Sequence, residues 1–205
     1  MYSTRSGLIL AFHGCDVSVV NDILTGGTNL QKSKNKYDWL GHGIYFWDNS
    51  PSRALEYASF LSKNPGRAKR PITKPAVIGA VINLGLCLDL LDFDNLKLLK
   101  LGYEVLSTSY TSSGFDLPKN KNTKGSQDLL LRELDCAVIE TLHNVREQEG
   151  LRPFDSVRGV FWEGEPLYEG AGFREKDHIQ ICIRNPNCIK GYFLPRMPDG
   201  KFEKV

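Results

Sequence analysis

The chain has 205 residues, of which 41% are hydrophobic and 24% are charged, and its formal net charge is +2. This length and composition fit a single globular domain, and the net charge is too small to indicate a nucleic-acid partner by itself. No apolar stretch approaches the length of a membrane span, and the apolar run at 8–12 is shorter than the core of a signal peptide.

The cysteines indicate a reducing compartment. There are five of them, an odd number, and no two form a CxxC pair. Such a set argues against a disulfide framework and for free thiols in the cytoplasm. The sequence also lacks a four-ligand zinc pattern, so we expect no metal site.

The first part of the chain predicts a strand, a short helix and a loop. Residues 7–13 form an apolar run that ends in a His-Gly pair and predict a buried strand. Asp16 is placed to cap a helix over 17–24, and two glycines end that helix. Residues 28–38 are polar and lysine-rich and predict a loop.

A glycine-flanked aromatic strand follows. The run Ile-Tyr-Phe-Trp at 44–47 favours a strand, and the glycines before it let a backbone or ligand approach closely. Ser50 is a good N-cap for a helix over 51–62, which begins with proline. Residues 63–75 are basic and proline-rich and predict a loop.

The middle of the chain is mainly helical in pattern. A β-branched run predicts a strand over 75–84, before a helix over 92–101 that residues 103–112 extend. Residues 114–125 are polar and lysine-rich and predict a loop. A helix is expected from 126 or 127 to 149, with its apolar residues near one face.

The last third is rich in strands. We expect strands over 157–162, 178–184 and 189–194, and the second of them alternates between apolar and polar residues. A glycine-rich loop with several acidic residues fills 163–176.

Strands therefore lie early and late, with the longer helices between them. This order predicts an α+β fold of two small antiparallel or mixed sheets packed together and flanked by helices. We expect one domain over 1–205, with a helical insertion at about 85–150. No GxGxxG follows a strand, so a Rossmann nucleotide site is not expected.

Candidate functional residues lie on three of these strands: His13 with Gly14, Tyr45, and Gln180. Each has an ordinary structural interpretation as well. A histidine at a strand end is often hydrogen-bonded within the fold, and a tyrosine in a strand often belongs to the hydrophobic core. A glutamine in a strand often lies on the solvent-exposed face. Spacing alone does not show that the three converge.

The combination resembles the NAD-binding core of ADP-ribosyltransferases, in the poly(ADP-ribose) polymerase-like, diphtheria-toxin-type branch that carries His-Tyr-Glu on three strands. The resemblance is specific over 8–60, weaker over 156–194 and absent over 85–150. Small bacterial members, some of them toxins, are also similar in having glutamine at the third position. The motif residues are Phe12-His13-Gly14, Ile23-Leu24-x-x-Gly27, Gly41-x-Gly43-Ile44-Tyr45-Phe46-x-Asp48-Asn49-Ser50, Ser52-x-Ala54 and Asp177-His178-Ile179-Gln180-Ile181-Cys182-Ile183.

The resemblance implies that NAD is a substrate, split between nicotinamide and ribose through an oxocarbenium-like transition state. It implies that the Tyr45 ring stacks on the nicotinamide and favours its cationic form. Gly14 would offer its backbone N–H and C=O to the carboxamide, and His13 would bind a ribose or adenosine hydroxyl.

The resemblance also assigns Gln180 to the position where many members have a glutamate that steadies the developing positive charge. A glutamine there keeps hydrogen bonding and loses the charge. Efficient chain elongation is therefore not expected, whereas mono-ADP-ribosylation or slow NAD hydrolysis is. Glu163 and Glu165 are candidates on the acceptor side, and a solvated glycine turn is the alternative interpretation of their loop.

Two departures from the family pattern concern the nicotinamide pocket. Cys15 stands where the family often has serine, which weakens one hydrogen bond to the carboxamide. Tyr57 is the candidate for a second stacking tyrosine and falls one residue later than the pattern expects. Ser52 is the candidate for the serine that contacts the carboxamide.

The sequence thus leads us to expect an NAD-dependent mono-ADP-ribosyltransferase, toxin-like and cytoplasmic, whose acceptor is a protein or a nucleic acid. An antitoxin or another regulatory partner fits such an enzyme, and a membrane partner does not. Three alternatives stay open. The first is a catalytically weak or inactive module that binds NAD or ADP-ribose, and the second is an NAD glycohydrolase. The third is a structural or interaction domain that binds no nucleotide.

Overall fold

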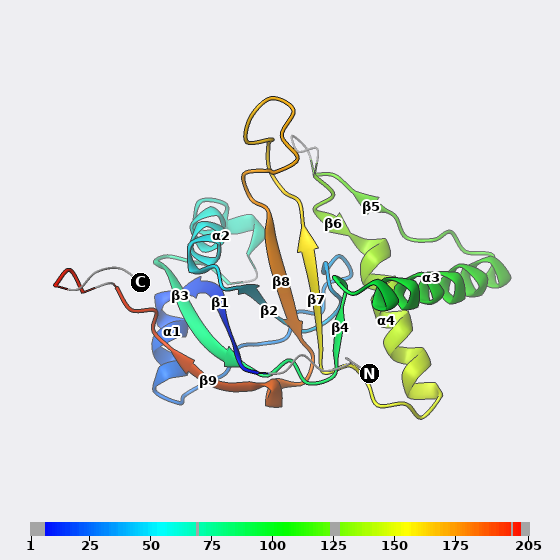
Figure 1. The fold of residues 1–205 in the computed structure, drawn as a ribbon, viewed down its shortest axis with the longest axis horizontal. Coiled ribbons are helices and arrows are strands. Elements are labelled where there is room, and N and C mark those ends of the chain that lie inside the picture. Colours follow the sequence, from blue (N-terminus) through cyan, green and yellow to red (C-terminus); the bar gives the residue numbers. More distant parts are fainter. Residues whose placement is uncertain (1–6, 69, 124–127, 198, 202–205) are drawn as a thin grey trace.

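The computed structural model describes residues 7–68, 70–123, 128–197 and 199–201. Over these residues the chain is an α+β fold, with a seven-stranded mixed sheet, a two-stranded sheet and four α-helices (Figure 1). The helices α1 and α2 lie at one end of the large sheet, and α3 and α4 lie at the other.

The large sheet has the strand order β4-β7-β8-β2-β1-β3-β9. Its strands are β1 (Ile9–Asp16), β2 (Ile44–Asp48), β3 (Pro75–Ile82), β4 (Cys87–Asp89), β7 (Ser156–Phe161), β8 (His178–Ile183) and β9 (Ile189–Phe193). The small sheet pairs β5 (Asn120–Lys121) with β6 (Leu131–Arg132). The helices are α1 (Val17–Leu24), α2 (Pro51–Lys63), α3 (Phe93–Ser113) and α4 (Glu133–Gln148), with 3₁₀ turns at Pro65–Arg67 and Pro186–Cys188.

The sequence suggested two small packed sheets, and this expectation is wrong for the described residues. The late strand β8 pairs with β2 on one side and with β7 on the other, both antiparallel. Strands from the two ends of the chain therefore join in one sheet. Only β4 runs parallel to its neighbour β7 among the described pairs.

Each face of the sheet is covered differently. On one face, α1 packs over a core that includes Phe46, Ile78 and Ile181, all fully buried. The other face carries two separate clusters, one under α2 around Phe12 and Trp47 and one against α4. We call this second side the α2/α4 face, and the centre of the sheet lies between its two clusters.

The segment expected to be a helical insertion begins with a strand of the main sheet, β4, before α3. The helix α3 is continuous from Phe93 to Ser113. It passes through Gly102, where an added Cβ would lie 3.4 Å from the Leu142 Cβ of α4. An alanine at this position would make ordinary van der Waals contact with α4, so the packing of the two helices does not depend on the glycine.

The helix α4 starts later than its apolar pattern suggested. It begins at Glu133, and the expected start at 126 or 127 lies outside the described residues. Residues 131–132 pair with β5 instead of continuing the helix. The Asn120 side chain then accepts hydrogen bonds from the N–H groups of Leu134 and Asp135, at 2.9 and 3.2 Å. The cap is supplied from a distant part of the chain, which a local pattern does not reveal.

None of the helices in the described ranges has both the length and the hydropathy needed to cross a membrane.

His143 is a buried histidine on α4. Its ring is 4% exposed and meets the edge of Phe154 at a centroid distance of 5.8 Å. Neither ring nitrogen has a hydrogen-bond partner among the described residues. Burial, followed by the positive charge of Arg184, lowers the pKa of His143 to about 4. The folded protein therefore holds this imidazole neutral at pH 7.

We predict that His143 makes the protein less stable as the pH falls from about 6.5 toward 4. The unfolded chain takes up the proton first, so the folded state loses stability throughout this window. His143→Leu removes the titration, and the stability of the variant relative to wild type should rise by up to about 3 kcal/mol on acidification. Urea unfolding of both proteins across this pH range measures the difference, and parallel curves would contradict the prediction.

Candidate functional site

The three strands that carry the candidate residues are neighbours in the sheet. β2 lies between β1 and β8, so Tyr45 is on the middle strand, with His13 and Gln180 on the strands beside it. Residues that are more than 160 positions apart in the chain are therefore brought to one part of the sheet.

The sheet opens between β1 and β2 at His13. Only Ala11↔Asp48 and Phe12↔Trp47 pair across the two strands, although β1 continues to Asp16 and β2 reaches back to Ile44. β1 remains paired with β3 along its whole length. It is therefore β2 that departs from β1, and we call the unpaired stretch beyond their last pair the opening.

The His13 ring fixes the edge of this opening. Its Nδ1 lies 2.7 Å from the carbonyl oxygen of Tyr45, so Nδ1 carries the proton and donates. Burial lowers the pKa of His13, which keeps the imidazole neutral. Nε2 has no partner among the described residues. The ring lies beside Phe46, at a centroid distance of 5.9 Å, and so on the face opposite to α2 and α4.

The backbone of Gly14 points into the opening. The Leu10 carbonyl accepts from Asn49 N at 3.1 Å, which shows that the peptide groups of Leu10 face β2. Because these directions alternate along a strand, Phe12 and Gly14 face the same way. The ladder to β2 ends at Phe12, so the N–H and C=O of Gly14 face the opening.

Gly14 is also required by the packing of α2. A Cβ at this position would lie 2.0 Å from the backbone oxygen of Ala54 and 3.1 Å from the Cβ of Ala58. The helix therefore rests directly on the strand at Gly14. The sequence explained this glycine by the approach of a ligand, and the structure supplies a packing reason as well.

Tyr45 braces the turn that precedes its strand. Its hydroxyl donates to the Gly41 carbonyl at 2.7 Å and accepts from Leu40 N at 2.8 Å. Burial, together with the nearby Cys182 thiol, raises the pKa of Tyr45 well above its usual value, so the phenol stays neutral. The ring is partly exposed and packs against the cluster beneath α4. The hydroxyl is thus committed to the fold, and only the ring surface remains for a ligand.

The insertion holds the same turn from the other side. Glu140 of α4 accepts from His42 N at 2.8 Å and from Arg184 Nη1 at 2.5 Å, and Arg184 Nη1 also donates to the His42 carbonyl at 3.1 Å. Gly41 has a φ of 75°, and a Cβ there would lie 2.5 Å from the Glu140 carboxylate. Sequence reasoning missed Glu140 and Arg184, because only the folded chain brings α4 to this turn.

Gln180 occupies the centre of the α2/α4 face. It is in register with Trp47 of β2 and Gly159 of β7, and it is partly exposed. Its amide has no hydrogen-bond partner in the described part of the chain. Gln180 therefore offers both a donor and an acceptor on this face.

Of the four remaining candidates, Tyr57 and Glu163 lie close to residues on the same face as Gln180, and Ser52 and Glu165 do not. The Tyr57 ring of α2 is 39% exposed and packs on Trp47 at a centroid distance of 5.1 Å. Glu163 accepts from Arg53 Nη2 at 2.7 Å. Ser52 is exposed in the first turn of α2, and Glu165 is exposed in the loop between β7 and β8.

His178 is the residue of this face that the motif did not single out. Its side chain is 2% exposed, and its ring lies 5.8 Å from Phe161 and 6.5 Å from Trp47 between centroids. Nδ1 donates to the Lys176 carbonyl at 2.6 Å, and burial lowers the pKa of the ring. The period of two along β8 places His178 on the same face as Gln180, which was the available signal.

Four buried polar atoms at or beside His178 have no hydrogen-bond partner in the described residues: His178 Nε2, Asp177 Oδ1, Trp47 Nε1 and Arg53 Nε. The Arg53 guanidinium lies 5.7 Å from the Trp47 ring, which lies 6.5 Å from the His178 ring. Buried polar groups are normally paired, so an unpaired set of this size calls for an explanation such as bound water, an ion or a functional role.

No protein-family model matches this chain, and a search of curated proteins finds none with significant similarity. Within the described residues, no group of three or more His, Cys, Asp or Glu side chains is arranged to hold a metal ion.

We predict that Gly14→Ala destabilises the protein by about 3 kcal/mol, because its methyl group overlaps the Ala54 carbonyl and forces α2 away from β1. Gly191→Ala is the matched control, since Gly191 is also in a strand of this sheet and a Cβ there meets no atom within 4 Å. Its effect should stay within about 0.5 kcal/mol. Urea denaturation of the two variants decides, and equal stabilities would show that the helix does not rest on Gly14.

Proposed function

We propose that this protein is an NAD-dependent ADP-ribosyltransferase that splits the nicotinamide–ribose bond and transfers one ADP-ribose to an acceptor. The observation that carries the proposal is the opening between β1 and β2, with Gly14 facing it and the strands of Tyr45 and Gln180 beside it. The fold proposed with this activity is that of the ADP-ribosyltransferases. In this chain β8 pairs with a strand on each side, so the large sheet is continuous through β8.

The carboxamide of nicotinamide suits the Gly14 backbone. A carboxamide has one acceptor oxygen and one donor nitrogen, and a strand residue whose pairing has ended offers one N–H and one C=O in the same direction. In the proposal these groups bind the carboxamide in the opening. His13 keeps the opening in place through its bond to the Tyr45 carbonyl, and its ring lies on the face of the sheet opposite to Gln180.

Aromatic surface for the nicotinamide comes from two tyrosines. The ring of Tyr57 is partly exposed, and it belongs to the helix that rests on Gly14. The ring of Tyr45 keeps a partly exposed surface although its hydroxyl is used. Stacking of a ring on the departing pyridinium is worth about 1–2 kcal/mol when water is excluded.

Gln180 decides what kind of transfer is proposed. Its amide can bind the 2′-hydroxyl of the nicotinamide ribose, but it adds no negative charge beside the oxocarbenium ion. This supports single transfers or slow hydrolysis rather than polymer synthesis. The five cysteines are free and buried, which fits a protein that works in a reducing compartment such as the cytoplasm.

The uncharged Gln180 also favours a second candidate function. A domain that binds NAD or ADP-ribose without cleaving it needs the opening and the aromatic rings but no charge at this position. An NAD glycohydrolase would differ from the transferase in using water as the acceptor. The acceptor of the transferase is proposed to be a protein or a nucleic acid.

Nicotinamide release from NAD separates these functions. A transferase should release nicotinamide faster when a cell extract supplies acceptors, and label from the adenylate part of NAD should appear on a macromolecule. Release that the extract does not change identifies a glycohydrolase. An increase of the melting temperature with NAD and no release identifies the binding module. The absence of both nicotinamide release and a change in melting temperature would contradict the proposal.

We predict that Gln180→Glu raises nicotinamide release by about tenfold, because the carboxylate adds a charge that favours the oxocarbenium ion. Gln180→Ala should lower it by a similar factor. Gln148→Glu makes the same chemical change at an exposed position near the end of α4 and should leave the rate unchanged. Steady-state rates at saturating NAD test this, and equal rates for all Gln180 variants would remove the residue from the site.

A further inference from the structure

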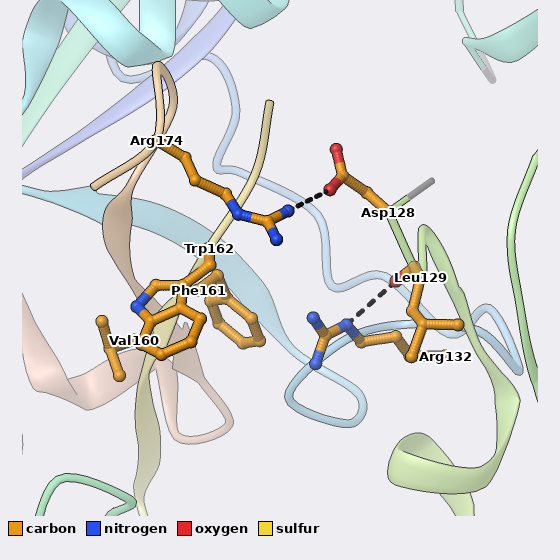
Figure 2. A pocket seen from close by; sticks show the side chains of 7 residues that line it. All are labelled: Asp128, Leu129, Arg132, Val160, Phe161, Trp162 and Arg174. Atoms are coloured by element: carbon orange, nitrogen blue, oxygen red, sulfur yellow. Dashed lines mark hydrogen bonds and ion pairs between the residues drawn. The ribbon is translucent and has the colours of Figure 1, made fainter. Parts of the chain in front are cut away.

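A pocket of about 360 Å³ lies beside the C-terminal end of β7, and Gln180 is not among the residues that line it. β4 pairs only with Ser156, Val157 and Arg158 of β7, and the pocket begins beyond that pairing. Its walls come from β7 and the residue after it, from the segment that leads into α4, and from the loop between β7 and β8 (Figure 2).

Two guanidinium groups line this pocket. The Arg132 guanidinium is stacked on aromatic rings, with its central carbon 4.6 Å from the centroid of Trp39 and 4.8 Å from that of Phe161. Its Nε donates to the Leu129 carbonyl at 3.1 Å, which fixes its orientation. Arg174 comes from the opposite wall, and its Nη1 lies 3.2 Å from a carboxylate oxygen of Asp128 (Figure 2).

Both guanidiniums keep donors for a ligand. In the described part of the chain, Nη2 of Arg132 and Nη2 of Arg174 have no hydrogen-bond partner. Arg174 is paired with Asp128, and Nη1 of Arg132 lies 3.4 Å from Asp135, so each guanidinium already has one carboxylate partner. The donors that remain on both guanidiniums suit an anionic group such as a phosphate.

The pocket also offers an unoccupied aromatic surface. The Trp162 side chain is 66% exposed and lies next to Phe161 at the pocket (Figure 2). Trp47 is buried, and Trp39 is covered by Arg132. An exposed indole beside two guanidiniums is a stacking surface next to an anion site, which is the pairing that a nucleotide requires.

We propose that this pocket binds a single nucleotide, with the base stacked on Trp162 and the phosphate held between Arg132 and Arg174. The volume of about 360 Å³ is at the lower end of ligand pockets, which suits a mononucleotide better than a dinucleotide. The same chemistry serves a free nucleotide and one nucleotide of a single strand. The inference does not rest on NAD chemistry, because Arg132, Arg174 and Trp162 lie outside the opening and make no printed contact with Gln180; Phe161 is shared, since its ring also lies 5.8 Å from His178.

Fluorescence of Trp162 gives a direct test, since it is the exposed tryptophan of the three. Titration with AMP, GMP, CMP and UMP should quench the emission in a saturable way, and inorganic phosphate alone should bind far more weakly. A single-stranded oligonucleotide that binds more tightly than its mononucleotides identifies a strand as the ligand, and equal or weaker binding identifies the free nucleotide. A lack of saturable binding by every nucleotide would overturn the proposal.

Variants assign the binding to this pocket. Arg174→Gln and Arg132→Gln should each weaken binding by about tenfold, and Trp162→Leu by a similar factor when calorimetry replaces fluorescence. Arg67→Gln is the matched control, because Arg67 also lies over a ring, that of Phe60 at 5.4 Å, away from the pocket. Unchanged affinity in both pocket arginine variants, or stronger binding by acidic peptides than by nucleotides, would refute the proposal.

Two controls keep this test independent of folding and of the proposed transferase. Arg132 packs on two rings, so circular dichroism checks that its variant is folded, and the more exposed Arg174 provides the second variant. Arg174→Gln should leave nicotinamide release from NAD unchanged, and Gln180→Glu should leave nucleotide quenching unchanged. A failure of either proposal is thereby distinguished from a failure of the other.

Discussion

The hydrogen bond from His13 Nδ1 to the Tyr45 carbonyl joins two strands at the point where their ladder ends. The same ring packs on Phe46 of β2, and Cys15 of β1 shares a core cluster with Ile44 and Phe46, so packing holds the two strands together beyond their last pair. Burial lowers the pKa of His13, and Nδ1 can donate to the carbonyl in the neutral and in the charged form of the ring. Beyond the last pair, the peptide groups of the buried Gly14 face the side from which β2 has departed, and the chemistry proposed for this protein depends on them.

Two helices from different parts of the chain hold the borders of the opening. α2 rests on Gly14 through Ala54, and α4 holds the turn before β2 through Glu140. The second contact comes from the insertion, where the resemblance to ADP-ribosyltransferases is absent. Arg184 at the end of β8 completes it, so the strand of Gln180 and the turn before Tyr45 are fixed by one ion pair.

Much of the fold could be predicted because its signals are local. Asp16 caps α1, Asp92 caps α3 where the sequence placed a helix from 92, and β8 alternates; each of these signals acts within a few residues. The start of α4 could not be predicted, since Asn120 caps it from a distant segment. The joining of early and late strands into one sheet could not be predicted either, because the residue pattern of a strand does not identify the strand with which it pairs. In the site, periodicity gave the shared face of His178 and Gln180 but not the packing of the His178 ring against Trp47 and Phe161.

The most direct measurement is the nuclear magnetic resonance spectrum of the ¹⁵N-labelled protein during titration with nicotinamide. If the carboxamide binds in the opening, the backbone amide of Gly14 should show one of the largest shifts, with Tyr45 and Gln180 nearby. The amide of Gly191, on the far strand β9, should not move. Saturating nicotinamide that leaves Gly14 unshifted, or that shifts only residues away from β1 and β2, would contradict the account.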